Sequence, residues 1–275
     1  MPNLGLIGCG NMGRALVRGW TLGSTFDRSE IYVSDGKYSD SVKTFCEEYL
    51  VSMSSSNLEL VRKCDIIVLA VKPHSVGSVF ESLGNARVSL TGKLVISILA
   101  GVSVEKLRDL AKDDQHSGIR WVRCMPNTPA LLSAGITAFA LSSTCLDDDV
   151  ALVERVLQGA GSVLQVKESQ LNAVTGLSGS GPAYVYTFIE SLAAGGVLAG
   201  LTSSQALTLA VQTTLGAARM VDELHESPAV LRDMVCTPGG TTIHGVHALE
   251  QNNFRFAVME AVRSAAERSK AMGED

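Results

Sequence analysis

Short apolar runs alternate with helix-like stretches up to residue 167 of the chain. The strand-like runs are Leu4–Ile7, Ile31–Val33, Ile66–Val71, Leu94–Ile98, Ile119–Arg123, Ile136–Leu141 and Val163–Val166. Helix-like segments lie between most of them, for example Met12–Leu22, Ser41–Tyr49, Val104–Ala111 and Asp148–Leu157. This alternation predicts an α/β domain of the doubly wound Rossmann type, with a parallel sheet and helices on both faces.

The pattern changes after Glu168, where the strand-like runs stop. The later segments are helical in character: Gly181–Leu198, Ser204–Leu224, Pro228–Val235, Thr242–Gln251 and Arg255–Met272. Ser227 and Pro228 are typical of an N-cap followed by proline at the first helical position. We therefore predict two domains, residues 1–166 with the sheet and residues 167–275 entirely α-helical.

The stretch from Ser191 to Ala218 contains no charged residue and is long enough to span a bilayer. Gly200 is suited to end one helix, and Thr202 with Gln205 fits the capping box of a second. The alternatives are two helices buried in a protein assembly and a membrane span. Lipid would leave polar side chains such as Gln212 poorly satisfied, so the pattern favours an assembly without membrane contact.

Composition narrows the class of protein. The chain carries 23 Lys+Arg against 28 Asp+Glu, a net charge of −5, which argues against a nucleic-acid partner. The six cysteines are scattered, so we expect reduced thiols and no metal site. Met1, Pro2 and Asn3 lead into an apolar run too short for a signal peptide, which favours the cytoplasm, or an organelle if a presequence has been removed.

Gly8, Gly10 and Gly13 form a G-x-G-x-x-G motif between the first predicted strand and the first predicted helix. The first glycine permits a tight turn, the second allows a pyrophosphate to approach the backbone, and the third allows helix and strand to pack closely. The free N–H groups of the helix start face such a phosphate. The motif therefore predicts a dinucleotide-binding loop.

Other candidates for this site follow later strands. Asp35 comes about twenty residues after Gly13, where a carboxylate binds the adenosine ribose and disfavours a 2′-phosphate, although it could also only cap a turn. Ser34, Lys37 and Asn57 remain candidates for binding a phosphate. Lys72 and Ala100 follow strands whose carboxyl ends line the ligand crevice of a doubly wound sheet, but both are also ordinary turn residues.

Two further glycine clusters lie in the helical region, at 178–181 and 239–240. Each is expected to begin a helix with free N–H groups and hydroxyls, which suits a small carboxylate, although a well-capped helix start is the simpler alternative. No lysine lies between Lys167 and Lys270, which argues against alcohol oxidation of the β-hydroxyacid dehydrogenase type. His225, His244 and His247 are the conventional acid–base candidates there, with a surface or packing role as the alternative.

Longer motifs resemble the pyrroline-5-carboxylate reductase family over nearly the whole chain. They are Thr175–Ala183, Leu231–Asp233, Pro238–Ile243, Leu249–Glu250, Phe254–Arg255, Ala70–Pro73 and Asn127–Pro129. The resemblance implies reduction of 1-pyrroline-5-carboxylate to L-proline with NADH or NADPH, the last step of proline biosynthesis. It also implies a homodimer with interlocked carboxyl-terminal helices, with possible further assembly into a decamer of five dimers.

The same resemblance implies roles for particular residues. The dinucleotide contacts would be Ile7, Gly8, Cys9, Gly10, Asn11, Met12, Ser34, Asp35, Asn57, Ala70, Val71, Lys72 and Ala100. The substrate region would include Glu168, Ser178, Gly179, Ser180, Gly181, Gly240, Thr241 and Thr242. Backbone N–H groups at Gly240 and Thr241 would hold the substrate carboxylate. The Thr242 hydroxyl would bond the ring nitrogen and guide its proton.

Alternatives remain at this point. Several relatives carry a residue other than Asp at position 35, so the choice between NADH and NADPH is open. A reductase of a related cyclic imine carboxylate, such as the six-membered homologue, would have the same motifs. A nucleotide-binding regulator without catalysis is the alternative from another class of protein.

Overall fold

The computed structural model describes residues 2–36, 39–113 and 118–274 of the chain. These residues form two compact units. The first unit is Met1–Gly179 together with Ala265–Asp275, and the second is Ser180–Ser264. Each unit is described by itself below.

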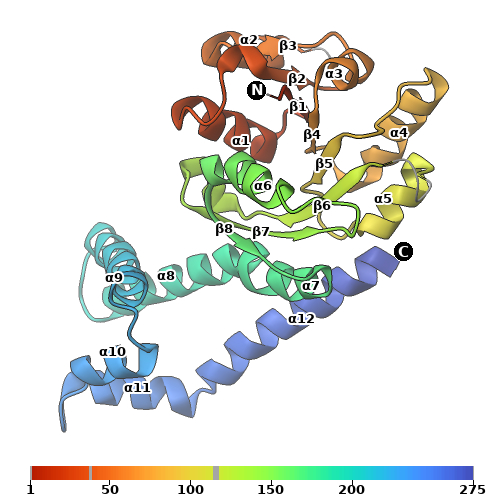
Figure 1. The fold of residues 1–275 in the computed structure, drawn as a ribbon. Helices are drawn as coiled ribbons and strands as arrows, with labels where there is room; N and C mark the ends of the chain where they lie inside the picture. Colours follow the sequence, from red (N-terminus) through yellow and green to blue (C-terminus); the bar gives the residue numbers. More distant parts are fainter. Residues whose placement is uncertain (1, 37–38, 114–117, 275) are drawn as a thin grey trace. The chain divides into compact units, whose positions relative to one another are not determined.

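The first unit is built on an eight-stranded sheet with the order β3-β2-β1-β4-β5-β6-β7-β8 (Figure 1). The strands are β1 Leu4–Ile7, β2 Ile31–Ser34, β3 Ser52–Met53, β4 Ile66–Leu69, β5 Leu94–Ser97, β6 Arg120–Met125, β7 Gly135–Leu141 and β8 Gly161–Gln165. The strands from β3 to β6 pair in parallel. The predicted Rossmann-type α/β fold is thereby confirmed.

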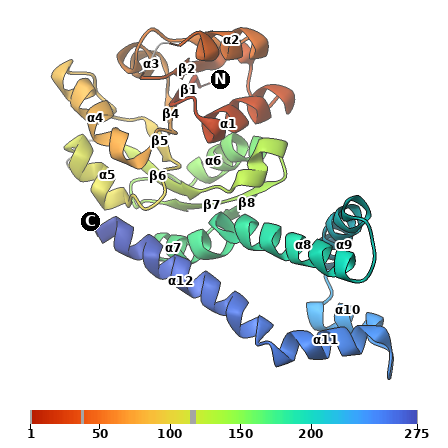
Figure 2. The same cartoon turned by 180° about the vertical axis from the view of Figure 1, so that it is seen from behind.

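Helices cover both faces of this sheet, as Figures 1 and 2 show from opposite sides. They are α1 Asn11–Leu22, α2 Asp40–Tyr49, α3 Asn57–Lys63, α4 Val76–Asn85, α5 Val104–Ala111, α6 Asp149–Leu157 and α7 Leu171–Val174. Trp20 is buried in the core on the face of α1, α2 and α6, and Trp121 in the core on the face of α3, α4 and α5. Because both faces are buried, the central strands consist of continuous apolar runs.

Two features of the sheet differ from the prediction. The two-residue strand β3 was not predicted, because Ser52 and Met53 form no apolar run. The expectation of a parallel sheet is wrong at β7, which pairs antiparallel with β6, while β8 is parallel to β7. Only residues 126–134 connect β6 to β7, and a parallel crossover needs a dozen or more residues.

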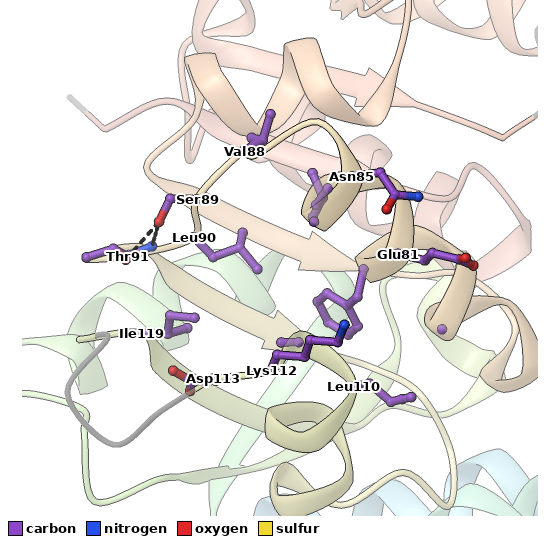
Figure 3. A pocket seen from close by; sticks show the side chains of 15 residues that line it. Glu81, Asn85, Val88, Ser89, Leu90, Thr91, Leu110, Lys112, Asp113 and Ile119 are labelled. Atoms are coloured by element: carbon purple, nitrogen blue, oxygen red, sulfur yellow. Dashed lines mark hydrogen bonds between the residues drawn. The ribbon is translucent and has the colours of Figure 1, made fainter.

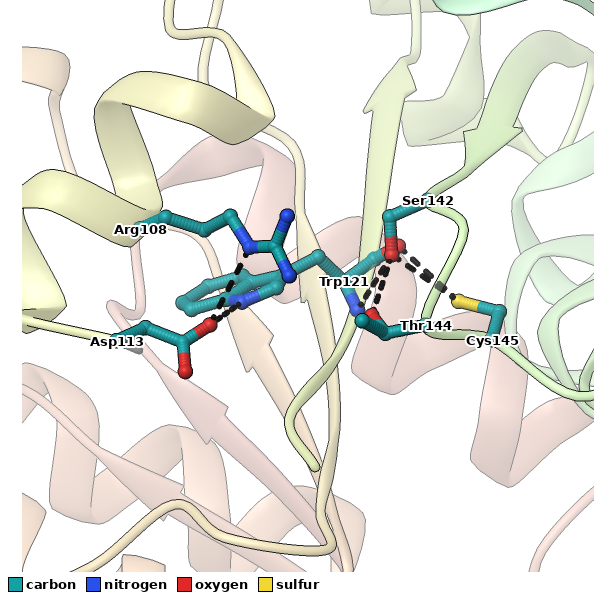
Figure 4. A network of polar contacts seen from close by, with 6 residues as sticks. All are labelled: Arg108, Asp113, Trp121, Ser142, Thr144 and Cys145. Carbon is teal, nitrogen blue, oxygen red and sulfur yellow. Dashed lines mark hydrogen bonds and ion pairs between the residues drawn. The ribbon is translucent and has the colours of Figure 1, made fainter. Parts of the chain in front are cut away.

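A polar network fastens the end of α5 to β6 (Figure 4). The Asp113 carboxylate accepts a hydrogen bond from the Trp121 indole N–H at 2.7 Å and lies 3.4 Å from the Arg108 Nε. Ser142 directly follows the neighbouring strand β7, and its hydroxyl accepts a hydrogen bond from the Trp121 backbone N–H at 3.2 Å. The network therefore fixes the strand that leads to the carboxyl edge of the sheet.

The second unit consists of helices. The helices of this region are α8 Gly181–Leu198, α9 Ser203–Leu224, α10 Pro228–Val235, α11 Thr241–Gln251 and α12 Phe254–Glu274, the last of which extends into the first unit. The capping box of Thr202 with Gln205 and the N-cap at Ser227 are both formed. Among the described helices, none has both the length and the apolar character that a membrane crossing requires.

Candidate functional site

The glycine motif forms the turn between β1 and α1, as predicted. Gly8 has a φ of +105°, and a Cβ there would lie 2.7 Å from the carbonyl carbon of Ala70. A Cβ at Gly13 would lie 2.3 Å from the Gly8 oxygen. A Cβ at Gly10 would meet no atom within 4 Å, so this glycine faces open space. The loop is thus closely packed behind and open in front, as a phosphate-binding loop must be.

A cavity of about 740 Å³ opens in front of this loop. The predicted cofactor residues that line it are Gly8, Cys9, Gly10, Asp35, Asn57, Ala70, Val71 and Lys72. Ser78 and Ser82 of α4 also line it and were not predicted. Ser78 and Ser82 are four residues apart and therefore share one face of α4, shortly after Lys72. This spacing is the sequence signal that could have identified them.

Asp35 and Asn57 are both fixed by hydrogen bonds at the edge of this cavity. The Asp35 carboxylate accepts from the Cys9 backbone N–H at 3.1 Å. The Ser34 hydroxyl donates to the Asn57 side-chain oxygen at 2.7 Å. The acidic residue therefore lies against the glycine loop at the end of β2, where a ribose-binding carboxylate is expected. Lys37 lies outside the described residues.

The other predicted cofactor residues do not line the cavity. Ile7 is buried at the end of β1, and Gly13 is buried in α1. Asn11 and Met12 are the first residues of α1, and Ala100 is exposed in the loop after β5.

Another cavity, of about 640 Å³, lies between α4 and α5 (Figure 3). Its lining includes Glu81, Asn85, Lys112 and Asp113. None of the residues lining it is a predicted site residue, so it is distinct from the glycine-loop cavity.

Glu168 lies in a short 3-10 helix, Glu168–Gln170, beside the amino end of α5. Its Oε1 accepts a hydrogen bond from the Val104 backbone N–H at 2.9 Å. The same oxygen lies 3.5 Å from the guanidinium of Arg123, a buried residue of β6. Sequence reasoning missed Arg123, although a charge at the end of an apolar strand was a signal.

The cluster at 178–181 begins a helix, as predicted: α8 starts at Gly181 with Ser180 as its N-cap, but no loop precedes it. The chain is already helical in α7, and it passes through a π-helical turn at Thr175–Gly179 before α8. Within this turn the Ser178 hydroxyl donates to the Val174 carbonyl at 3.1 Å. π-Helical turns occur frequently at functional sites.

The cluster at 239–240 does begin a helix, α11. Gly239 has a φ of +67°, and a Cβ at Gly240 would lie 2.3 Å from the Thr237 hydroxyl oxygen. The Gly240 N–H donates to the Thr237 carbonyl at 3.0 Å, so this group is already engaged. Thr241 and Thr242 occupy the first two helical positions, where an α-helix leaves N–H groups without an intrahelical partner.

The histidines of this region are exposed. The ring Nδ1 of His244 lies 2.9 Å from the Gly240 carbonyl oxygen, one turn earlier. Through this contact, the His244 side chain is part of the structure at the start of α11.

These features define a Rossmann-type dinucleotide-binding protein. Residues 3–101 match a family model described as NADP oxidoreductase, coenzyme F420-dependent, and residues 168–272 match one described as pyrroline-5-carboxylate reductase dimerisation. A pyrroline-5-carboxylate reductase of Methanosarcina acetivorans is 41% identical over 271 residues, 98% of each chain. The chain belongs to the pyrroline-5-carboxylate reductase family.

Solved structures agree with this assignment. A pyrroline-5-carboxylate reductase from Coxiella burnetii superposes with a TM-score of 0.91, at 36% identity over 98% of each chain. A pyrroline carboxylate reductase from Plasmodium falciparum, solved with NADP bound, gives a TM-score of 0.85 at 35% identity, covering 99% of this chain and 98% of that chain. The family's dimerisation region is therefore present in this chain at residues 168–272.

Proposed function

We propose that this protein reduces 1-pyrroline-5-carboxylate to L-proline with NADH or NADPH, the last step of proline biosynthesis. The observation that carries the proposal is the glycine-loop cavity, in a chain that matches a pyrroline-5-carboxylate reductase over 98% of its length. The protein is accordingly an oxidoreductase that acts on a C=N bond.

The residues of the glycine-loop cavity fit a dinucleotide. Gly10 leaves space for the pyrophosphate beside the first amides of α1, and Asp35 with Asn57 would bind the adenosine ribose. Lys72 and Ala100, after β4 and β5, would border the nicotinamide half, because ligands of doubly wound sheets bind at the carboxyl ends of strands. When bound, the reduced nicotinamide supplies the hydride for the imine carbon.

The substrate residues are proposed to be those of the helical region. The free amide of Thr241 at the positive end of α11 would bind the carboxylate, with Gly240 keeping the backbone accessible. Thr242 is the proposed catalytic residue, because its hydroxyl can bond the ring nitrogen and guide the proton. Glu168 and the turn from Ser178 to Gly181 would shape the pocket.

We also propose a division of labour between residues 1–166, which bind the dinucleotide, and residues 167–275, which bind substrate and form the dimer. Large apolar side chains are exposed on the second unit of the single chain, among them Leu198, Leu207, Leu215 and Phe256. Burial of this surface against a second copy would stabilise both. The proposed assembly is a homodimer with interlocked carboxyl-terminal helices, extended to a decamer of five dimers.

All six cysteines are free thiols, which suits a reducing compartment and supports the cytosol as the proposed location.

Steady-state kinetics with NADH and NADPH in parallel tests the function. We expect loss of nicotinamide absorbance with fresh 1-pyrroline-5-carboxylate and stoichiometric formation of proline. The six-membered cyclic imine carboxylate serves as the comparison substrate. Faster turnover of that ring would identify a related imine reductase, and tight NAD(P)H binding without any turnover would identify a nucleotide-binding regulator.

A further inference from the structure

Arg123 is a buried charged side chain in the sheet. It lies in β6 opposite Ser97 of β5, and its side chain is only 9% exposed. Its guanidinium lies 3.5 Å from the Glu168 Oε1. Among residues 2–36, 39–113 and 118–274, which the structure describes, the Arg123 side chain pairs with Glu168. Burying a guanidinium is costly, so this position calls for a specific role.

Glu168 connects Arg123 to the first amide of α5. The carboxylate oxygen that faces Arg123 is also the acceptor for the Val104 N–H, at 2.9 Å. A carboxylate at the amino end of a helix is favoured by the helix dipole and by the free N–H groups. Arg123 and Glu168 therefore hold the point at which α5 begins.

The segment held in this way is the loop after β5, residues 98–103, which leads into α5. It contains Ala100 and Gly101, and the latter has a φ of +74°. The other side of the loop touches the end of α12, where a Cβ at Gly273 would lie 2.9 Å from the Gly101 oxygen. Both ribbon views place the carboxyl-terminal end of α12 beside α5 (Figures 1 and 2). The loop is thus braced by two segments distant in the sequence.

We propose that Arg123 is a positioning residue for the nicotinamide half of the site. Acting through Glu168, it fixes the amino end of α5 and with it the loop that carries Ala100. The inference rests on the proposed dinucleotide-binding function. It assigns Glu168 a positioning role through Oε1, which leaves the other carboxylate oxygen available to the substrate.

The test compares two ligands that share the adenosine half. NADH contains the nicotinamide and ADP-ribose lacks it (NADPH and 2′-phospho-ADP-ribose replace them if the wild type prefers NADPH). In Arg123→Met and in Glu168→Gln, we expect NADH affinity to fall about tenfold, the loss that one charge-assisted hydrogen bond carries, with ADP-ribose affinity unchanged. Arg123→Lys should recover part of the NADH affinity because it keeps the charge.

Arg120→Met is the matched control. Arg120 is the first residue of the same strand, three residues before Arg123, and its ion pair with Asp149, at 2.5 Å, is partly buried. We expect this variant to lower the melting temperature and to leave the ratio of the two affinities unchanged. The double variant of Arg123 and Glu168 should lose no more NADH affinity than the weaker-binding single variant, because both act on one contact.

Several outcomes overturn the inference. These are equal losses of NADH and ADP-ribose affinity, no loss of either, or losses that multiply in the double variant. If Arg123→Met does not fold, the affinities for NADH and ADP-ribose are compared in Arg123→Lys and Glu168→Gln instead. A wild-type protein that binds neither dinucleotide and turns over no pyrroline-5-carboxylate refutes the proposed function itself, which is a separate result.

Discussion

The glycine loop allows one substitution, glycine to alanine, to be tested at two positions with opposite expected results. Gly10 faces open space in the cavity, whereas a Cβ at Gly13 would lie 2.3 Å from the Gly8 oxygen and 3.2 Å from Leu6 Cδ2. Gly10→Ala therefore adds a methyl group where the ligand should approach. Gly13→Ala adds the same methyl group where α1 already touches the loop.

The expected magnitudes follow from these surroundings. At Gly10, an N-cap with φ of −76°, alanine is a poorer cap but restricts the unfolded chain, and the two effects nearly cancel, within about 0.5 kcal/mol. At Gly13, the Cβ presses on backbone that cannot rotate away, and such overpacking costs about 1–3 kcal/mol. The Gly13 variant should therefore melt roughly 3–9 °C lower.

Binding should show the reverse order. A methyl group at Gly10 displaces the pyrophosphate from the amides of α1, and loss of one charge-assisted hydrogen bond, about 1.5–3 kcal/mol, weakens binding roughly ten- to hundredfold. NADH fluorescence titration measures this affinity, and thermal unfolding of the same samples measures stability. If Gly10→Ala binds NADH and NADPH as tightly as the wild type, the loop is not the phosphate site and the reasoning is refuted.

Three further predictions address catalysis, pH and assembly. Thr242→Ala should lower kcat at least tenfold with unchanged NAD(P)H affinity, and Thr242→Ser should retain activity; equal turnover of the alanine variant would contradict the assigned role. Burial, reinforced by the nearby Cys9, raises the pKa of the Cys46 thiol to about 11, so the folded state favours the neutral thiol. Its contribution to the free energy of unfolding is complete below the usual thiol pKa near 9, and it is lost between about pH 9 and 11. Over this pH range, the melting temperature of Cys46→Ala should therefore fall less steeply with pH than that of the wild type. Phe256→Glu, at a side chain that is 63% exposed, should convert dimers to monomers in sedimentation, whereas Leu22→Glu, at one that is 67% exposed on the other unit, should not.

Much of the fold could be predicted because burial on both faces leaves a plain sequence pattern. Leu4–Ile7 and Val104–Ala111 have the predicted bounds, since an apolar run and a regular helical period define them locally. The direction of β7 depends instead on the length of the preceding connection, and the pattern of β7 itself does not encode it. That connection was visible in the sequence as a short segment with two prolines.

The candidate site was predictable where the backbone conformation requires a particular residue type. Gly8 and Gly239 have the positive φ that suits glycine, and both lie in motifs that the sequence singled out. The contact of Arg123 with Glu168 joins residues 45 positions apart, and no local spacing announces it. The π-helical turn before α8 could not be predicted from the sequence either, because serine and glycine, as at Ser178 and Gly179, are also typical of an ordinary helix start.

The exposed apolar side chains of the second unit have a consequence for the proposed substrate residues. Thr242 lies in this unit, in which Ala206, Ala210 and Leu231 are the buried apolar residues among those described. So small a core contributes little to holding the start of α11 in a fixed position. A second copy that covers the exposed side chains would supply the missing burial, so we expect the geometry around Thr242 to depend on assembly. Activity per chain should therefore fall on dilution below the dimer dissociation constant, while NAD(P)H binding to the first unit, which has its own extensive core, should persist.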